Sequence, residues 1–129
     1  MSYKTLIIIK CIVCLSFGPL LLFLPEQLLS LLGTPFGLGA AITSREYGAA
    51  LVGNVFLTWF ARNAGPSSAR TAIIIYLFVY DAVALVAISI MQLQGAMNLL
   101  SWGIVAVYLF FTFGFGQLLL KQHRSAVSE

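Results

Sequence analysis

Charged residues are scarce in this sequence. Of its 129 residues 9% are charged, with seven Lys and Arg against four Asp and Glu, and 60% are apolar. A water-soluble domain of this length cannot cover its surface with so few charges. We therefore expect an integral membrane protein that folds as one domain over residues 1–129.

The sequence also lacks the common signatures of catalysis and metal binding. It has no phosphate-binding P-loop, no nucleophile elbow and no serine triad pattern. Its single histidine, His123, has no second ligand at metal-binding spacing. The basic residues stand singly at the ends of apolar segments, which disfavours nucleic acid as a partner. We expect no metal and no cofactor, and we favour a protein that is not an enzyme.

Only two cysteines occur, Cys11 and Cys14, and they have the C-x-x-C spacing of dithiol redox sites. Both fall inside an apolar segment, on the side that we expect to face the cytoplasm, where thiols stay reduced. Helix geometry does not orient residues three apart for an easy disulfide, and no second pair could relay electrons. We interpret both as small apolar packing residues.

Four stretches are long and apolar enough to cross a membrane. A helix needs about twenty mostly apolar residues to cross roughly 30 Å of hydrocarbon. The stretches are residues 5–24, 45–62, 70–92 and 98–120. The first begins like a signal peptide but has no small-residue cleavage site, so we expect it to be retained. The predicted fold is all-α, an up-down bundle of four transmembrane helices.

The segment between the first two spans carries helix signals. Pro25 suits a first helical position, Glu26 the first turn and Gly33 the end of a short amphipathic helix at the membrane interface. Residues 34–42, TPFGLGAAI, predict an irregular apolar loop. Thr43 and Glu46 have capping-box spacing, which predicts that the second span begins there.

The basic residues predict the orientation of the chain. If the N-terminus is cytoplasmic, only Arg45 lies on the outer side, and all the others lie inside. Those inner residues are Lys4, Lys10, Arg62, Arg70, Lys121 and Arg124. We expect both termini to be cytoplasmic, in a bacterial inner membrane. Trp59, near Arg62, and Trp102, at the outer start of the fourth span, suit the interfacial aromatic belts.

Asp81 lies in the middle of the third span, with no other charge within ten positions. Such a group costs several kcal/mol unless it faces the bundle interior, finds a partner or is protonated. Arg70, Asp81 and Gln92 recur every eleven residues and so form a polar stripe on one helix face, which must point inward. Asp81 is either a structural polar residue or a proton-binding or ligand-binding carboxylate.

Two residues at a similar depth are candidate partners for Asp81. Lys10 has a long stem, but its side chain leans toward the cytoplasm, and we favour its extension to the headgroups. Asn54 is the better hydrogen-bond candidate, with simple helix-to-helix bonding as the alternative.

Arg45 and Glu46 lie near the outer boundary and project about 100° apart, so they need not pair. The capping box explains Glu46, whereas Arg45 could hold a lipid phosphate or an acid of a neighbouring helix.

Small and aromatic residues predict how the helices pack. Ala49 and Gly53 form a small-xxx-small step, and Gly114 and Gly116 provide similar close approach in the fourth span. We expect the neighbouring phenylalanines to divide between lipid and core. They are Phe110, Phe111, Phe113 and Phe115.

Pro25 with its short helix, REYGAALVGNVFLTWFAR at 45–62 and NLLSWGI at 98–104 together resemble the small four-helix bacterial membrane proteins of the DoxX-like group. The resemblance covers most of the chain. It implies a four-helix fold and, for some members, an accessory role in quinol oxidation or thiosulfate metabolism. The chain shows no catalytic signature of that group, so the resemblance carries over the fold alone.

Three functions fit these observations. The first, which we favour, is a non-enzymatic homo-oligomer or an accessory subunit of a larger membrane complex. The second is a transporter or channel for protons, ions or a small solute, with Asp81 as the binding group and Arg70 and Gln92 along its path. The third is a quinone-binding or lipid-binding partner of an oxidoreductase, in which Arg45 and Trp102 frame an outer mouth.

Overall fold

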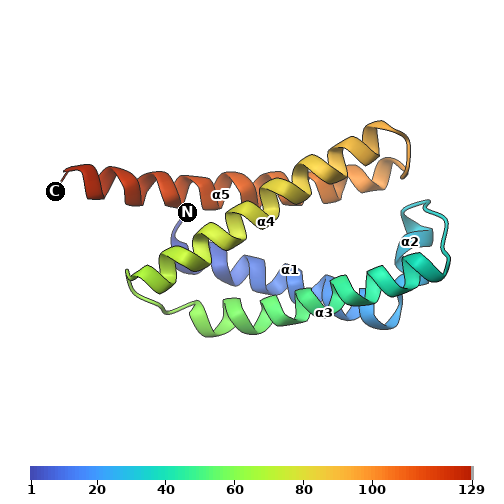
Figure 1. Cartoon of the computed structure of the whole chain (residues 1–129), viewed down its shortest axis with the longest axis horizontal. Helices are drawn as coiled ribbons and strands as arrows, with labels where there is room; N and C mark the ends of the chain where they lie inside the picture. Colours follow the sequence, from blue (N-terminus) through green and yellow to red (C-terminus); the bar gives the residue numbers. More distant parts are fainter. Residues whose placement is uncertain (129) are drawn as a thin grey trace.

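The chain is almost entirely helical in the computed structural model, which describes residues 1–128 (Figure 1). The helices are α1 (Tyr3–Phe23), α2 (Pro25–Leu31), α3 (Leu38–Ala61), α4 (Ser68–Leu93), the short 3-10 helix η1 (Leu99–Ser101) and α5 (Trp102–Ser128). The described residues contain no β-strand, so the prediction of an all-α fold is confirmed.

Among the described residues, three segments are long and apolar enough to cross a membrane. They are Tyr3–Phe23, Ser68–Leu93 and Leu99–Val127. The fourth long helix, α3, has 24 residues but is not among them. It carries Arg45, Glu46 and Asn54, which lower its hydropathy. By length and composition the chain is a small membrane protein with three candidate spans.

The helices form two packed pairs. α3 packs along α1, and α4 packs along α5, so the chain makes two helical hairpins that lie against each other (Figure 1). Both termini lie toward the same end of the molecule (Figure 1).

The main apolar core joins α1, α4 and α5 near that end. It consists of Tyr3, Leu6, Ile7, Ile74, Leu77, Phe111, Phe115 and Leu118. Phe110 and Phe113 point outward instead, so the predicted division of the phenylalanines is confirmed. A smaller cluster of Cys14, Leu21 and Leu51 fills the space between α1 and α3.

Glycine allows α1 and α3 to approach closely, but at a different step from the predicted one. A Cβ atom on Gly48 would lie 2.9 Å from the carbonyl oxygen of Gly18 and 2.9 Å from the backbone nitrogen of Leu22. Within the chain, no described helix packs against the step of Ala49 and Gly53, since both residues are exposed and the space beside Gly53 is open, so the prediction that this step is buried inside the bundle is wrong. The sequence offers two small-residue faces on α3, and the one bearing Gly48 packs against α1.

The glycines of α5 also lie against neighbouring helices, as predicted. A Cβ atom on Gly114 would lie 2.9 Å from Cδ2 of Leu6, and one on Gly116 would lie 3.2 Å from the ring of Phe78.

The short helix α2 begins and ends where the sequence predicts. Pro25 is its first residue, Glu26 lies in its first turn, and Gly33 follows its end with a positive φ of 73°. The backbone N–H groups of Gly33 and Thr34 donate to the carbonyls of Ser30 and Leu29. This is a Schellman motif, for which glycine is the favoured residue.

The predicted loop and capping box before the second span are wrong. Only residues 34–37 are irregular, and α3 begins at Leu38, so Thr43 and Glu46 lie inside the helix. Thr43 Oγ1 donates to the Gly39 carbonyl four residues back, at 2.6 Å. The alanines that follow Gly39 are strong helix formers and outweigh the glycines that favoured a loop.

Asn98 attaches the turn between α4 and α5 to the end of α2. Its side-chain amide donates to the Leu31 carbonyl at 2.8 Å, and its backbone N–H donates to the Leu32 carbonyl at 2.9 Å. The connections opposite the chain termini are therefore held together.

We predict that Gly48→Ala destabilises the fold, because the added methyl group meets backbone atoms of α1 that cannot move aside. Overpacking of this kind typically costs about 1–3 kcal/mol. Thermal unfolding in detergent measures the effect. Gly39→Ala is the matched control, since Gly39 lies on the same helix with open space around it. Equal unfolding temperatures for the two variants would contradict the close contact.

Candidate functional site

A buried ion pair joins α1 to α4. Lys10 Nζ lies 2.5 Å from Asp81 Oδ1, and the two side chains are 3% and 0% exposed. The prediction that Asp81 faces the bundle interior is confirmed. A charge at this depth is tolerated because an opposite charge lies in hydrogen-bonding contact with it.

The predicted extension of Lys10 to the headgroups is wrong. Its ammonium group lies 4.5 Å from the ring centroid of Phe111 and 5.0 Å from that of Tyr80. Aromatic rings attract a cation through their negative faces. The Asp81 carboxylate and the two rings thus stabilise the Lys10 ammonium group inside the bundle, so its side chain does not extend to the membrane surface.

The predicted hydrogen bond between Asn54 and Asp81 is also wrong. Asn54 Oδ1 accepts from the Tyr76 hydroxyl at 3.0 Å. Asn54 Nδ2 and Asp81 Oδ2 are both buried, and neither has a hydrogen-bond partner among residues 1–128. One is an unpaired donor and the other an unpaired acceptor in the low-dielectric interior. Buried atoms of this kind are normally satisfied by protein or by ordered water.

Three tyrosine hydroxyls from three helices meet beside the ion pair. The Tyr80 hydroxyl of α4 donates to the Tyr47 hydroxyl of α3 at 2.5 Å, and the Tyr47 hydroxyl bonds in turn with that of Tyr108 on α5. The ring of Tyr80 also contacts the Lys10 ammonium. Sequence reasoning missed this cluster, because a mid-span tyrosine carries no spacing signal that identifies its partners.

The other members of the α4 polar stripe have local partners. Gln92 is buried, and its amide donates to the Asn98 carbonyl at 3.0 Å. Arg70 is half-buried, with Nη1 donating to the Ala64 carbonyl at 3.2 Å. Eleven residues separate each from Asp81, about 16 Å along the helix. The stripe faces inward as predicted, but its members do not form one continuous network.

The residues predicted for the outer boundary do not converge. Arg45 and Glu46 are exposed, and Trp102 is 43% exposed in the first turn of α5. Arg45 has one long hydrogen bond, from Nη1 to the Ala41 carbonyl at 3.5 Å. Within residues 1–128 no hydrogen bond or ring contact joins Arg45 to Trp102.

The two cysteines are free and buried, as packing residues are expected to be. Cys11 Sγ lies 3.6 Å from the Val55 carbonyl, and Cys14 belongs to the α1–α3 cluster. Among the described residues no group of three or more His, Cys, Asp or Glu side chains is placed to hold a metal ion.

Comparison with protein-family models, with curated proteins and with solved structures finds no match for this chain. Inference about function therefore depends on the geometry. Two hollows on the surface, one between the start of α4 and the end of α5 and one on the C-terminal half of α4, are not lined by Lys10 or Asp81. The arrangement around Asp81 can tie two helices together or bind a proton, a water molecule or a small polar group.

We predict that the Lys10–Asp81 pair shows strong coupling in a double-mutant cycle. Lys10→Met and Asp81→Asn each leave the remaining partner without its counterpart, which typically costs about 3–5 kcal/mol for a buried pair. The double variant should lose less stability than the sum of the two, because no uncompensated charge remains. Free energies of unfolding in one detergent give the three values. Simple additivity would show that the pair does not form.

Proposed function

We propose that this chain is a four-span membrane bundle that acts as a non-enzymatic homo-oligomer. The fourth crossing is α3. It runs antiparallel along the full length of α1, from the Tyr3 hydroxyl, which donates to the Ala61 carbonyl at 2.9 Å, to the contact of Gly18 with Gly48. Because α1 is itself a candidate span, a helix packed along it occupies the same depth of the bilayer.

The proposed orientation places both termini in the cytoplasm of a bacterial cell, with the protein in the inner membrane. It is supported by the excess of basic residues at the end of the bundle where both termini lie (Figure 1). The helix α2 then lies at the outer interface, next to the turn between α4 and α5, and Asn98 of that turn bonds to the end of α2. Membership of the DoxX-like group is part of this proposal and is supported by the four long helices and the Pro25 helix.

The outward face of α3 carries the proposed self-association. At ~100° per residue, Ala49 and Gly53 lie in the middle of this face, with Arg45 on one flank and Glu46 on the other. All four are exposed. In lipid, small residues favour helix association because they let two backbones approach closely.

The charges on this face are self-complementary. Two parallel copies of α3 related by a two-fold axis bring the Arg45 flank of each against the Glu46 flank of the other, so two reciprocal ion pairs form at once. This pattern of a small step between opposite charges is the observation that carries the proposal. An accessory subunit could use the same face for a different protein, but that reading does not explain why the two flanks complement each other.

A second candidate function is transport of a proton, an ion or a small solute through binding at Asp81. The observation that favours it is the buried and unpaired Oδ2 atom of that carboxylate, beside the tyrosine cluster. Recognition of a quinone or lipid by Arg45 and Trp102 remains a prediction, and no contact in the described residues supports it.

We predict that Gly53→Cys cross-links to a dimer under mild oxidation in native membranes, because the residue lies at the proposed two-fold contact. Val83→Cys, 63% exposed on α4, is the matched control and should stay monomeric. Arg45→Glu should weaken the cross-link, since like charges then face each other, and Arg45→Glu with Glu46→Arg should restore it. Equal cross-linking at positions 53 and 83, or no recovery in the swapped variant, would exclude this interface.

The transport candidate predicts that proteoliposomes carrying the wild-type chain conduct protons or take up solute and that Asp81→Asn loses the flux. The substitution retains the side-chain shape and removes the charge. Circular dichroism of the same preparation establishes that the variant is folded. Absence of flux in both proteins would remove this candidate.

A further inference from the structure

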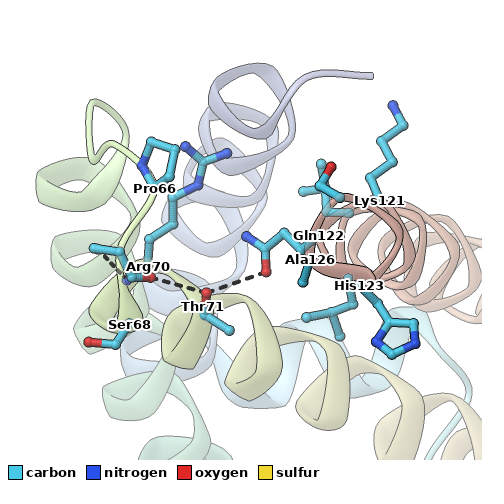
Figure 2. A pocket seen from close by; sticks show the side chains of 12 residues that line it. Pro66, Ser68, Arg70, Thr71, Lys121, Gln122, His123 and Ala126 are labelled. Atoms are coloured by element: carbon cyan, nitrogen blue, oxygen red, sulfur yellow. Dashed lines mark hydrogen bonds between the residues drawn. The ribbon is translucent and has the colours of Figure 1, made fainter. Parts of the chain in front are cut away.

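A hollow at the basic end of the bundle is independent of the proposed oligomer. It lies between the first turn of α4 and the last turns of α5 and has a volume of about 740 Å³ (Figure 2). Three of the side chains that line it are basic or imidazole groups, namely Arg70, Lys121 and His123. The lining residues include no Asp or Glu. We infer that this hollow binds a phosphate group, and specifically the headgroup phosphate of an anionic phospholipid.

The walls of the hollow are held in place by contacts between the helices. Thr71 Oγ1 of α4 bonds with Oε1 of Gln122 on α5 at 3.3 Å (Figure 2). With its oxygen engaged, the amide group of Gln122 retains its two N–H groups as donors. The Arg70 guanidinium stacks on the Tyr3 ring at 4.0 Å and bonds to the Ala64 carbonyl.

Arg70 keeps donor capacity in this position. Its guanidinium is bonded through Nη1 to the Ala64 carbonyl at 3.2 Å. A guanidinium group has five N–H donors in a planar fork that matches phosphate oxygens. The N-terminus of the 26-residue helix α4, capped by Ser67, opens beside it and adds the positive end of the helix dipole. These groups together present charge and directed donors to one anion.

The depth and the apolar wall favour a lipid over a soluble phosphate ester. The 27 residues of α5 extend about 40 Å, longer than the roughly 30 Å hydrocarbon core, so residues 121–127 lie at headgroup level. Leu118 and Leu119 continue the lining toward the membrane interior, where an acyl chain would follow its phosphate. In the proposed orientation this is the cytoplasmic leaflet, in which anionic lipids attract basic residues.

The test titrates the detergent-solubilised chain with phosphatidylglycerol or phosphatidylcholine and counts bound lipid by native mass spectrometry. Phosphatidylglycerol should bind more tightly, and Lys121→Gln should weaken its binding ~5-fold, which is typical of one basic residue near an anionic surface. Arg70→Gln should have a larger effect, and its folding is checked by circular dichroism. Arg124→Gln is the matched control, because it removes the same charge from α5 at an exposed position outside the lining.

Loss in Lys121→Gln with no change in Arg124→Gln supports the site. Equal loss in both variants would show diffuse attraction by surface charge and would overturn it. A third arm adds inorganic phosphate. If phosphate alone binds with the same variant dependence and phosphatidylglycerol shows no preference, the occupant is a soluble phosphate and the lipid assignment is wrong.

Discussion

The buried contact between Lys10 and Asp81 fixes how the two halves of the molecule pack together. It joins the α1–α3 hairpin to the α4–α5 hairpin. Leu6 precedes Lys10 by four residues and Leu77 precedes Asp81 by four, so the main apolar core lies one helical turn from the pair on both helices. Separation of the hairpins would strand two charges in a low-dielectric interior, and the pair therefore holds α1 and α4 in register.

The polar residues of α3 fall into two groups, one buried against other helices and one exposed on the outward face. Asn54 points inward and bonds with Tyr76, whereas Arg45 and Glu46 point outward near the end of the helix that faces α2. Composition alone leaves this helix out of the candidate spans, yet it packs along α1, which is one of them, and this packing supports the fourth crossing that we propose. Lipid offers polar atoms no partner, so the outward position of Arg45 and Glu46 fits the self-association that we propose for this helix.

Much of the fold could be predicted from the sequence, and much of the site could not. Pro25 and Gly33 mark their helix ends because each residue has a strong backbone preference of its own. The inward position of Asp81 follows from the cost of a charge in lipid. The partner of Asp81 could not be predicted in this way, because Lys10 and Asn54 lie at similar depths. Asn54 bonds with Tyr76 instead, and the sequence does not indicate where the Tyr76 side chain points. Gly48 and Gly53 have the same preference for close contact, and only the packing decides which one touches α1. The cluster of Tyr47, Tyr80 and Tyr108 could not be predicted either, because its members come from three helices and share no spacing in the sequence.

The number of membrane crossings can be measured from the positions of the chain ends, since four crossings place both ends on one side of the membrane and three place them on opposite sides. Single cysteines at Ser2, Gly37 and Ala126 would be treated with a membrane-impermeant maleimide in intact and in broken cells. The account predicts that position 37 reacts in intact cells and that positions 2 and 126 react only after breakage. Reaction of positions 2 and 126 from opposite sides would contradict it.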